Sequence, residues 1–164
     1  MVAVFLTCCF LSGCRHVASP QADDLDAFIA AGFDDVTVYA IDSSRPIHPA
    51  SMEVGDYAQW ISQVDSTHFH RFPIRKQIVV TDQAAGRNLA SAASAGMRQW
   101  AAGAKCFEPH HGLRVRKGDT CFDLVICYSC DHVEVWSASD RGKIVTTSDK
   151  SQSALDAVLK RAKP

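Results

Sequence analysis

Four cysteines and two histidines lie close together in the C-terminal half of the chain, within residues 106–130. The set comprises Cys106, His110, His111, Cys121, Cys127 and Cys130. Thiolates and imidazoles are the ligands that structural zinc prefers, and cysteine pairs also form disulfides or exchange with other thiols. Three chemistries therefore follow from these residues: a disulfide framework, a zinc site, or a redox-active thiol pair.

A zinc site needs four converging ligands. Cys106, Cys127 and Cys130, with either His110 or His111, supply the three thiolates and one imidazole of a common tetrahedral site. The spacing is less specific than that of a zinc ribbon, because the chain has one Cys-x-x-Cys pair where a ribbon has two. Zinc is thus the one cofactor that the sequence offers, as an alternative to disulfides.

Cys127 and Cys130 also form the Cys-x-x-Cys spacing of thiol-disulfide oxidoreductases. Those enzymes place the pair at a helix N-terminus, where the helix dipole lowers the thiolate pKa. Here residues 131–136 alternate between polar and apolar types, which predicts a strand. The context therefore favours a structural disulfide over redox catalysis. His68 and His70 lie in a segment with no predicted element, and we expect them to be exposed.

Enzymatic motifs are not found elsewhere in the sequence. The chain has no Ser-His-Asp order, paired-carboxylate motif, phosphate-binding loop or HExxH element at a recognisable spacing. We therefore expect a protein that is not an enzyme.

Leu11, Ser12, Gly13 and Cys14 follow a short uncharged apolar run, residues 2–11. The run has the length of an export signal core and is too short for a bilayer span of about 20 residues. The tetrad resembles the lipobox of bacterial lipoprotein precursors. That resemblance implies that residues 1–13 are removed, that Cys14 is diacylated, and that the domain is exported and lipid-anchored in the bacterial cell envelope.

Removal of the signal changes the cysteine count and the expected size. The mature chain would have 151 residues (164 minus 13), which is typical of one domain. Cys8 and Cys9 leave with the signal and Cys14 carries lipid, so an even set of four remains in an oxidising compartment, where disulfides are the default. Four cysteines allow three pairings, and the sequence does not choose among them.

The charge balance limits the partners. A formal net charge of -1 provides no electrostatic footprint for nucleic acid or an anionic membrane surface. Contact with a membrane is therefore expected only through the lipid on Cys14, and no protein partner is indicated.

Residues 14–21 are expected to form a lipidated tether and residues 22–164 a single α+β domain. Three helices are predicted: from Asp23 or Asp24 to about Gly32, from Asp82 to Gly103, and from about Ser151 onward. Strands are predicted at residues 36–42, 74–81, 113–117, 122–127, 133–136 and 144–147. Residues 43–72 read as mostly irregular, with a possible short helix at 57–64. The last four strands predict an antiparallel meander packed with the helices.

Gly118 and Asp119 predict a two-residue hairpin turn between two of these strands. The resulting register places one apolar set on the buried face: Leu113, Val115, Phe122, Leu124 and Ile126. On the other face, Arg114 is opposite Asp123, Arg116 opposite Cys121, and His110 opposite Cys127.

Two segments carry a wider resemblance. Residues 106–113 read Cys-Phe-Glu-Pro-His-His-Gly-Leu, and residues 123–130 read Asp-Leu-Val-Ile-Cys-Tyr-Ser-Cys. They resemble a family of uncharacterised bacterial proteins, many exported, with a Cys-Phe-x-Pro-x-His-Gly segment followed by Asp-Leu-Val-Ile-Cys-Phe-x-Cys. The resemblance implies that Cys106, Cys127 and Cys130 are the shared cysteines, with Cys121 outside the pattern. It also places the family histidine at His111, whereas the hairpin register favours His110. No activity comes with it.

We therefore expect a non-enzymatic lipoprotein domain with a structural cysteine cluster, in which Cys127 pairs with Cys106 or Cys130. The alternative is a zinc-binding or thiol-redox-active protein that uses the same cysteines and a nearby histidine.

Overall fold

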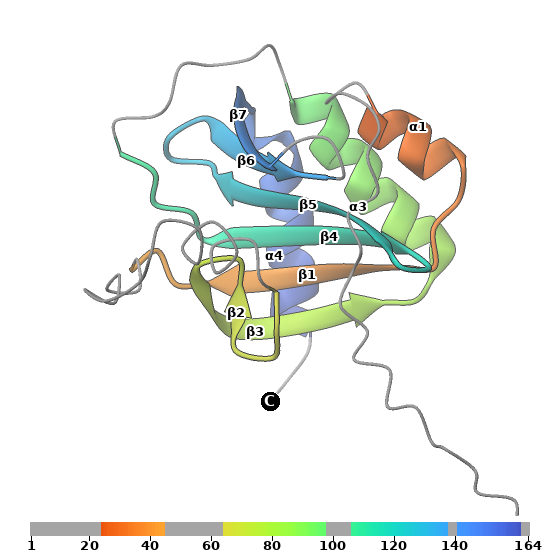
Figure 1. The fold of residues 1–164 in the computed structure, drawn as a ribbon, viewed down its shortest axis with the longest axis horizontal. Helices are drawn as coiled ribbons and strands as arrows, with labels where there is room; N and C mark the ends of the chain where they lie inside the picture. The colour runs from red at the N-terminus through yellow and green to blue at the C-terminus, as the bar shows by residue number, and fades with distance from the viewer. Residues whose placement is uncertain (1–23, 45–63, 98–105, 138–140, 162–164) are drawn as a thin grey trace, which may run out of the picture.

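The computed structural model describes residues 24–44, 64–97, 106–137 and 141–161. The helices are α1 (Asp24–Ala30), α3 (Gln83–Gly96) and α4 (Gln152–Arg161), the last preceded by a short 3-10 helix, η1 (Asp149–Ser151). The strands are β1 (Asp35–Ile41), β2 (His68–Phe69), β3 (Phe72–Val80), β4 (His111–Lys117), β5 (Thr120–Cys127), β6 (His132–Trp136) and β7 (Arg141–Thr146). This is the predicted α+β class (Figure 1).

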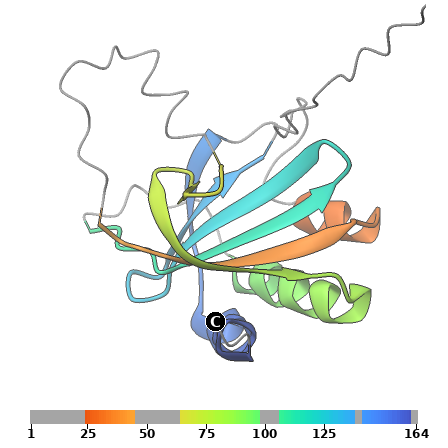
Figure 2. The same cartoon turned by 90° about the horizontal axis from the view of Figure 1, so that it is seen from below.

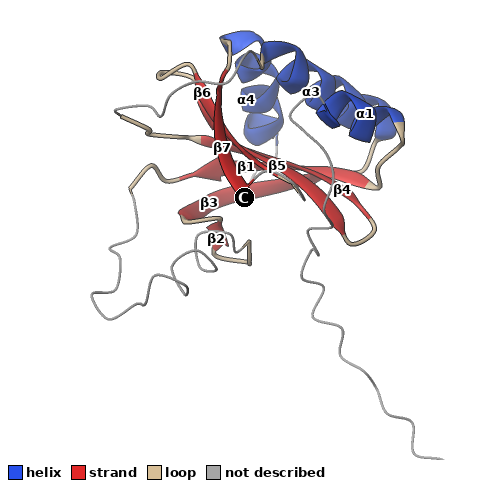
Figure 3. Ribbon diagram, turned by 45° about the horizontal axis from the view of Figure 1, so that its top comes forward, coloured by secondary structure: helices blue, strands red, loops and turns tan. Residues whose placement is uncertain are grey.

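All seven strands form one antiparallel sheet in the order β2-β3-β1-β4-β5-β6-β7. The sheet is strongly curled, and the three helices lie on one side of it (Figures 2 and 3). We call this side the helix face. The β2 strand curls over the opposite side (Figure 1), which we call the hairpin face.

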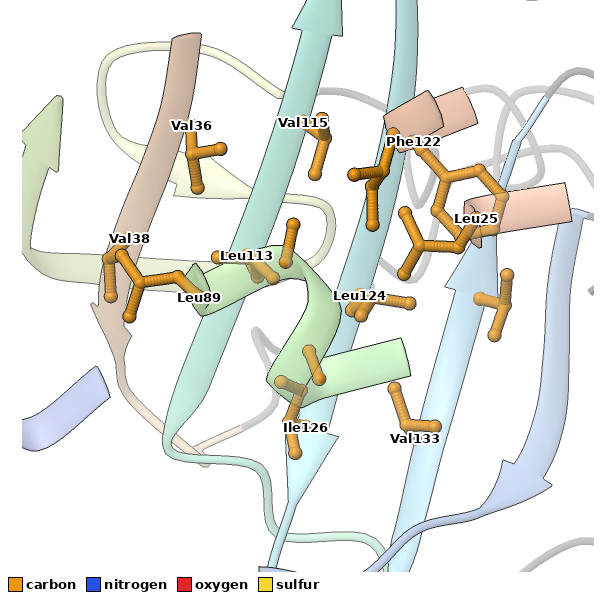
Figure 4. Close-up of a cluster of buried hydrophobic side chains, with 14 of the residues drawn as sticks. Leu25, Val36, Val38, Leu89, Leu113, Val115, Phe122, Leu124, Ile126 and Val133 are labelled. Carbon is orange, nitrogen blue, oxygen red and sulfur yellow. The ribbon is translucent and has the colours of Figure 1, made fainter. Parts of the chain in front are cut away.

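The main core lies on the helix face (Figure 4). Leu25 of α1 and Leu89 of α3 pack over Leu113 and Leu124 of the central strands. The predicted first helix is confirmed, and Gly32, with a φ of 83°, follows its end. A left-handed φ is readily adopted by glycine, which is why the helix stops there.

The α3 helix begins where the sequence predicts and ends earlier. Asp82 caps it, because its side chain accepts a hydrogen bond of 2.7 Å from the Ala85 backbone nitrogen. The predicted end at Gly103 is wrong, since Met97 already has an extended backbone. The carbonyl of Gly96 accepts a hydrogen bond from the Ser148 nitrogen at 3.0 Å, so a tertiary partner replaces the next helical turn.

The hairpin of β4 and β5 has the predicted register. Lys117 pairs with Thr120, Leu113 with Leu124, and Arg114 with Asp123. The five residues of the predicted buried face all belong to the helix-face core. The alternation of apolar and polar residues was therefore sufficient to set this pairing.

The hairpin of β2 and β3 was not predicted. Phe69 pairs with Phe72, and the turn between them consists of His70 and Arg71. His70 has a φ of 55°, which is uncommon for a residue other than glycine. The prediction of an irregular segment up to residue 72 is wrong here because the turn contains no glycine or asparagine to signal it.

Several expectations fall outside the described residues. These are the signal at 1–13, Cys14 and the tether at 14–21, most of the possible helix at 57–64, and Trp100, Gly103 and Ala162. Within the described ranges, no helix has both the length and the apolar character needed to cross a membrane.

Candidate functional site

The Cys-x-x-Cys segment forms the turn between β5 and β6. Cys127 and Cys130 are joined by a disulfide, with their Cα atoms 5.3 Å apart. Cys127 ends β5 and is only 1% exposed, whereas Cys130 is partly exposed. The two sulfurs of one disulfide thus differ strongly in their access to solvent.

The surroundings of this disulfide are those of a strand turn. The Ser129 hydroxyl lies 3.4 Å from the Cys127 sulfur, and a hydrogen bond joins the His132 ring to the Cys130 carbonyl. The next element is β6, so the pair does not lie at a helix N-terminus. The helix dipole that activates the oxidoreductase cysteines is therefore not available here.

The other two cysteines occupy different environments. Cys106 is free and exposed. Cys121 is buried within β5, opposite Arg116 as predicted. The even number of cysteines does not translate into two disulfides among these four, because Cys106 has a free thiol.

The two neighbouring histidines point to different places. The ring of His111 lies against α4, where its Nε2 is 2.9 Å from an Asp156 carboxylate oxygen. His110 is exposed, and its backbone nitrogen donates to the Ile126 carbonyl at 3.3 Å. Across the described ranges, no three His, Cys, Asp or Glu side chains gather into a cluster that could hold a metal ion.

Tyr128, inside the cysteine turn, connects this turn to the start of α4. Its hydroxyl lies 2.6 Å from the Ser151 hydroxyl, and its ring contacts His111 edge-on at 5.3 Å. Burial raises the pKa of Tyr128 to about 12, against a partial lowering by the Ser151 hydrogen bond. The phenol is therefore neutral and serves as a structural hydrogen-bonding group.

A second polar cluster lies on the hairpin face, centred on Asp123, which is 0% exposed. The Arg114 guanidinium donates two hydrogen bonds of 2.7 Å to its two carboxylate oxygens. The Nε2 of His70 lies 3.1 Å from one of the same oxygens. We call Asp123, Arg114 and His70 the buried triad.

The charges in this triad stabilise each other. Burial by itself would raise the pKa of Asp123, but the Arg114 charge and the hydrogen bonds from Arg114 and His70 hold it well below 3.8. Burial would likewise lower the pKa of Arg114, yet the Asp123 carboxylate raises it above its usual value. Asp123 and Arg114 therefore form a fully ionised buried pair.

The expectation that His70 is exposed is wrong, because it is only 1% exposed. Its ring stacks on Trp136 with the ring centres 4.5 Å apart. Next to it, Arg71 forms a salt bridge of 2.8 Å with Glu134 of β6. The turn of the β2-β3 hairpin is thus held against β5 and β6 by one histidine and one arginine.

Phe69 fixes the other side of the same hairpin. Its ring stacks on Tyr39 of β1 with the ring centres 4.3 Å apart. It also passes directly over Gly112, where an added Cβ would lie 2.6 Å from the Phe69 ring. Close packing of this kind explains the glycine in the His-His-Gly segment.

The sequence analysis found part of this arrangement. It paired Arg114 with Asp123 across the hairpin, but it missed His70, which lies 53 residues from Asp123 in the chain. The only signal for His70 was its position between two phenylalanines, Phe69 and Phe72, in a segment without a clear period.

Comparisons with protein-family models, with curated proteins and with solved structures found no match for this chain. The function must therefore be argued from the residues and the geometry described above.

Proposed function

We propose that this chain is a non-enzymatic domain of the bacterial cell envelope, anchored to a membrane by lipid on Cys14, with a disulfide that stabilises its β5-β6 turn. The disulfide carries the structural part of the proposal. It closes the end of the most apolar strand, and the Cys127 side chain belongs to the hairpin-face cluster with Phe107 and Trp136.

The anchoring part rests on the tetrad ending at Cys14 and on its resemblance to lipoprotein precursors. An exported domain is oxidised, which is the condition under which a Cys127–Cys130 bond persists. The two parts thus support each other, because the address and the bond require the same compartment.

A further part of the proposal concerns folding. We infer that β4 to β7 form as one meander, because each of these strands pairs with the next one in the chain. The cysteine turn is the middle connection of that unit, so a covalent bond there limits the conformations of the unfolded chain.

Two alternatives use the same sulfurs. Zinc would require Cys106, Cys127 and Cys130 as thiolates with a nearby histidine, while thiol exchange is favoured by the free Cys106. Peptide mapping of the purified protein without reductant, combined with zinc measurement, distinguishes them. We expect a Cys127–Cys130 peptide and no zinc. Three unmodified thiols with one equivalent of zinc would contradict the proposal.

A further inference from the structure

We propose that the disulfide has two positions, and that the Cys106 thiol exchanges with it to form a Cys106–Cys130 bond while releasing Cys127. The inference rests on the disulfide of the proposed function and goes beyond it, since a purely structural bond has one position. It assigns a separate role to each of the three cysteines.

The backbone brings Cys106 to the cysteine turn. The side chain of Phe107, the next residue, packs in the same apolar cluster as Cys127, and Cys130 packs against that cluster. Consecutive Cα atoms are about 3.8 Å apart, so the anchoring of Phe107 keeps Cys106 close to this region. A disulfide requires Cα atoms within about 7 Å, and this is the approach that the experiment below measures.

Exposure selects the sulfur that is attacked. Cys106 is exposed and Cys130 is partly exposed, whereas Cys127 is 1% exposed. A thiolate at Cys106 therefore reaches the Cys130 sulfur, and Cys127 becomes the leaving group.

Ser129 is placed to assist that departure. Its hydroxyl lies 3.4 Å from the Cys127 sulfur. A disulfide sulfur carries no hydrogen, so the hydroxyl is the donor and the sulfur is the acceptor. The same hydrogen bond strengthens as negative charge develops on Cys127.

The step is balanced without any oxidant. The Cys106–Cys130 bond forms as the Cys127–Cys130 bond breaks, and the proton lost by the Cys106 thiol to water is regained by Cys127. The released Cys127 thiol remains among apolar side chains, an environment that suits a small neutral thiol. The new bond closes a longer loop, which restricts the unfolded chain more than a loop of four residues does.

Two matched variants, Cys127→Ser and Cys130→Ser, test the assignment. Each is purified without reductant, treated with oxidised glutathione as the oxidant, alkylated in acid and mapped as non-reduced peptides. We expect Cys127→Ser to form a Cys106–Cys130 link within one chain. We expect Cys130→Ser to form no Cys106–Cys127 link, because the Cys127 sulfur is buried.

Separate glutathione adducts on Cys106 and Cys130 in the Cys127→Ser variant would overturn the proposal. A Cys106–Cys127 link in the Cys130→Ser variant would overturn the choice of Cys130 as the attacked sulfur.

The wild-type protein provides a test that does not depend on the folding of either variant. After incubation at pH 8 and acid quenching, we expect some chains with a Cys106–Cys130 peptide and an alkylated Cys127. Ser129→Ala should slow the appearance of this isomer about twofold to tenfold, the rate equivalent of one ordinary hydrogen bond. If Cys127–Cys130 is the sole pairing, the exchange is wrong and the proposed function stands. Zinc-bound thiols would instead overturn the proposed function.

Discussion

Gly112 lies where the ring of Phe69 crosses β4, so its lack of a side chain has a direct structural consequence. We expect Gly112→Ala to destabilise the protein by about 1–3 kcal/mol, the usual cost of overpacking, because the new Cβ would lie 2.6 Å from a ring that is itself stacked on Tyr39. Chemical denaturation measures this change. In a Phe69→Val background the cost should largely disappear, and an undiminished cost there would contradict the close contact.

Asp123 links the stability of the protein to pH. Its folded-state pKa is depressed below 3.8, so the unfolded chain takes up the proton first as the pH falls. Its contribution is therefore fully present above about pH 4 and is lost as the pH falls through the folded-state pKa. We expect Asp123→Asn to flatten this acid dependence in thermal melts between pH 4 and pH 2.

The same substitution should also lower stability at pH 7. Removing the carboxylate leaves the buried Arg114 charge without its partner, which typically costs about 3–5 kcal/mol. Asp42→Asn is the control, because Asp42 forms an exposed ion pair with Arg75 and such pairs contribute little. Equal effects of the two substitutions at pH 7 would argue against the buried pair.

At the scale of elements, the β4-β5 hairpin joins the two cores. Leu124 faces the helices and is 2% exposed, whereas Val125, the next residue, belongs to the hairpin-face cluster. We expect Leu124→Asp to cost several kcal/mol, because it buries an unpaired carboxylate. Gln77→Asp introduces the same residue at an exposed strand position and should leave the melting temperature nearly unchanged. Equal melting temperatures for the two variants would contradict the register.

At the scale of the whole molecule, the expected lipid anchor determines where the domain resides. We expect Cys14→Ala to move the protein from the membrane fraction to the soluble fraction, since a diacyl anchor supplies the two chains that stable binding requires. Cys106→Ala is the matched control and should stay with the membrane. Retention of the Cys14→Ala variant after a high-salt wash would contradict the lipid anchor.

The sequence by itself determined the local features of this fold. The cap at Asp82, the turn at Gly118 and the register of β4 with β5 all follow from short-range periodicity and turn chemistry, and the structure agrees with each. The separation of His111 from Cys127 also follows from that register, because successive residues of a strand point to opposite faces.

Only the tertiary structure decided the features that depend on distant segments. The α3 helix ends at Gly96 because Ser148 takes its carbonyl, and His70 is buried because Asp123 and Trp136 lie beneath the turn that carries it. The disulfide partner of Cys127 was likewise left open by spacing. Such contacts depend on how the curled sheet brings remote residues together, and neither hydrophobic period nor turn propensity encodes that distance.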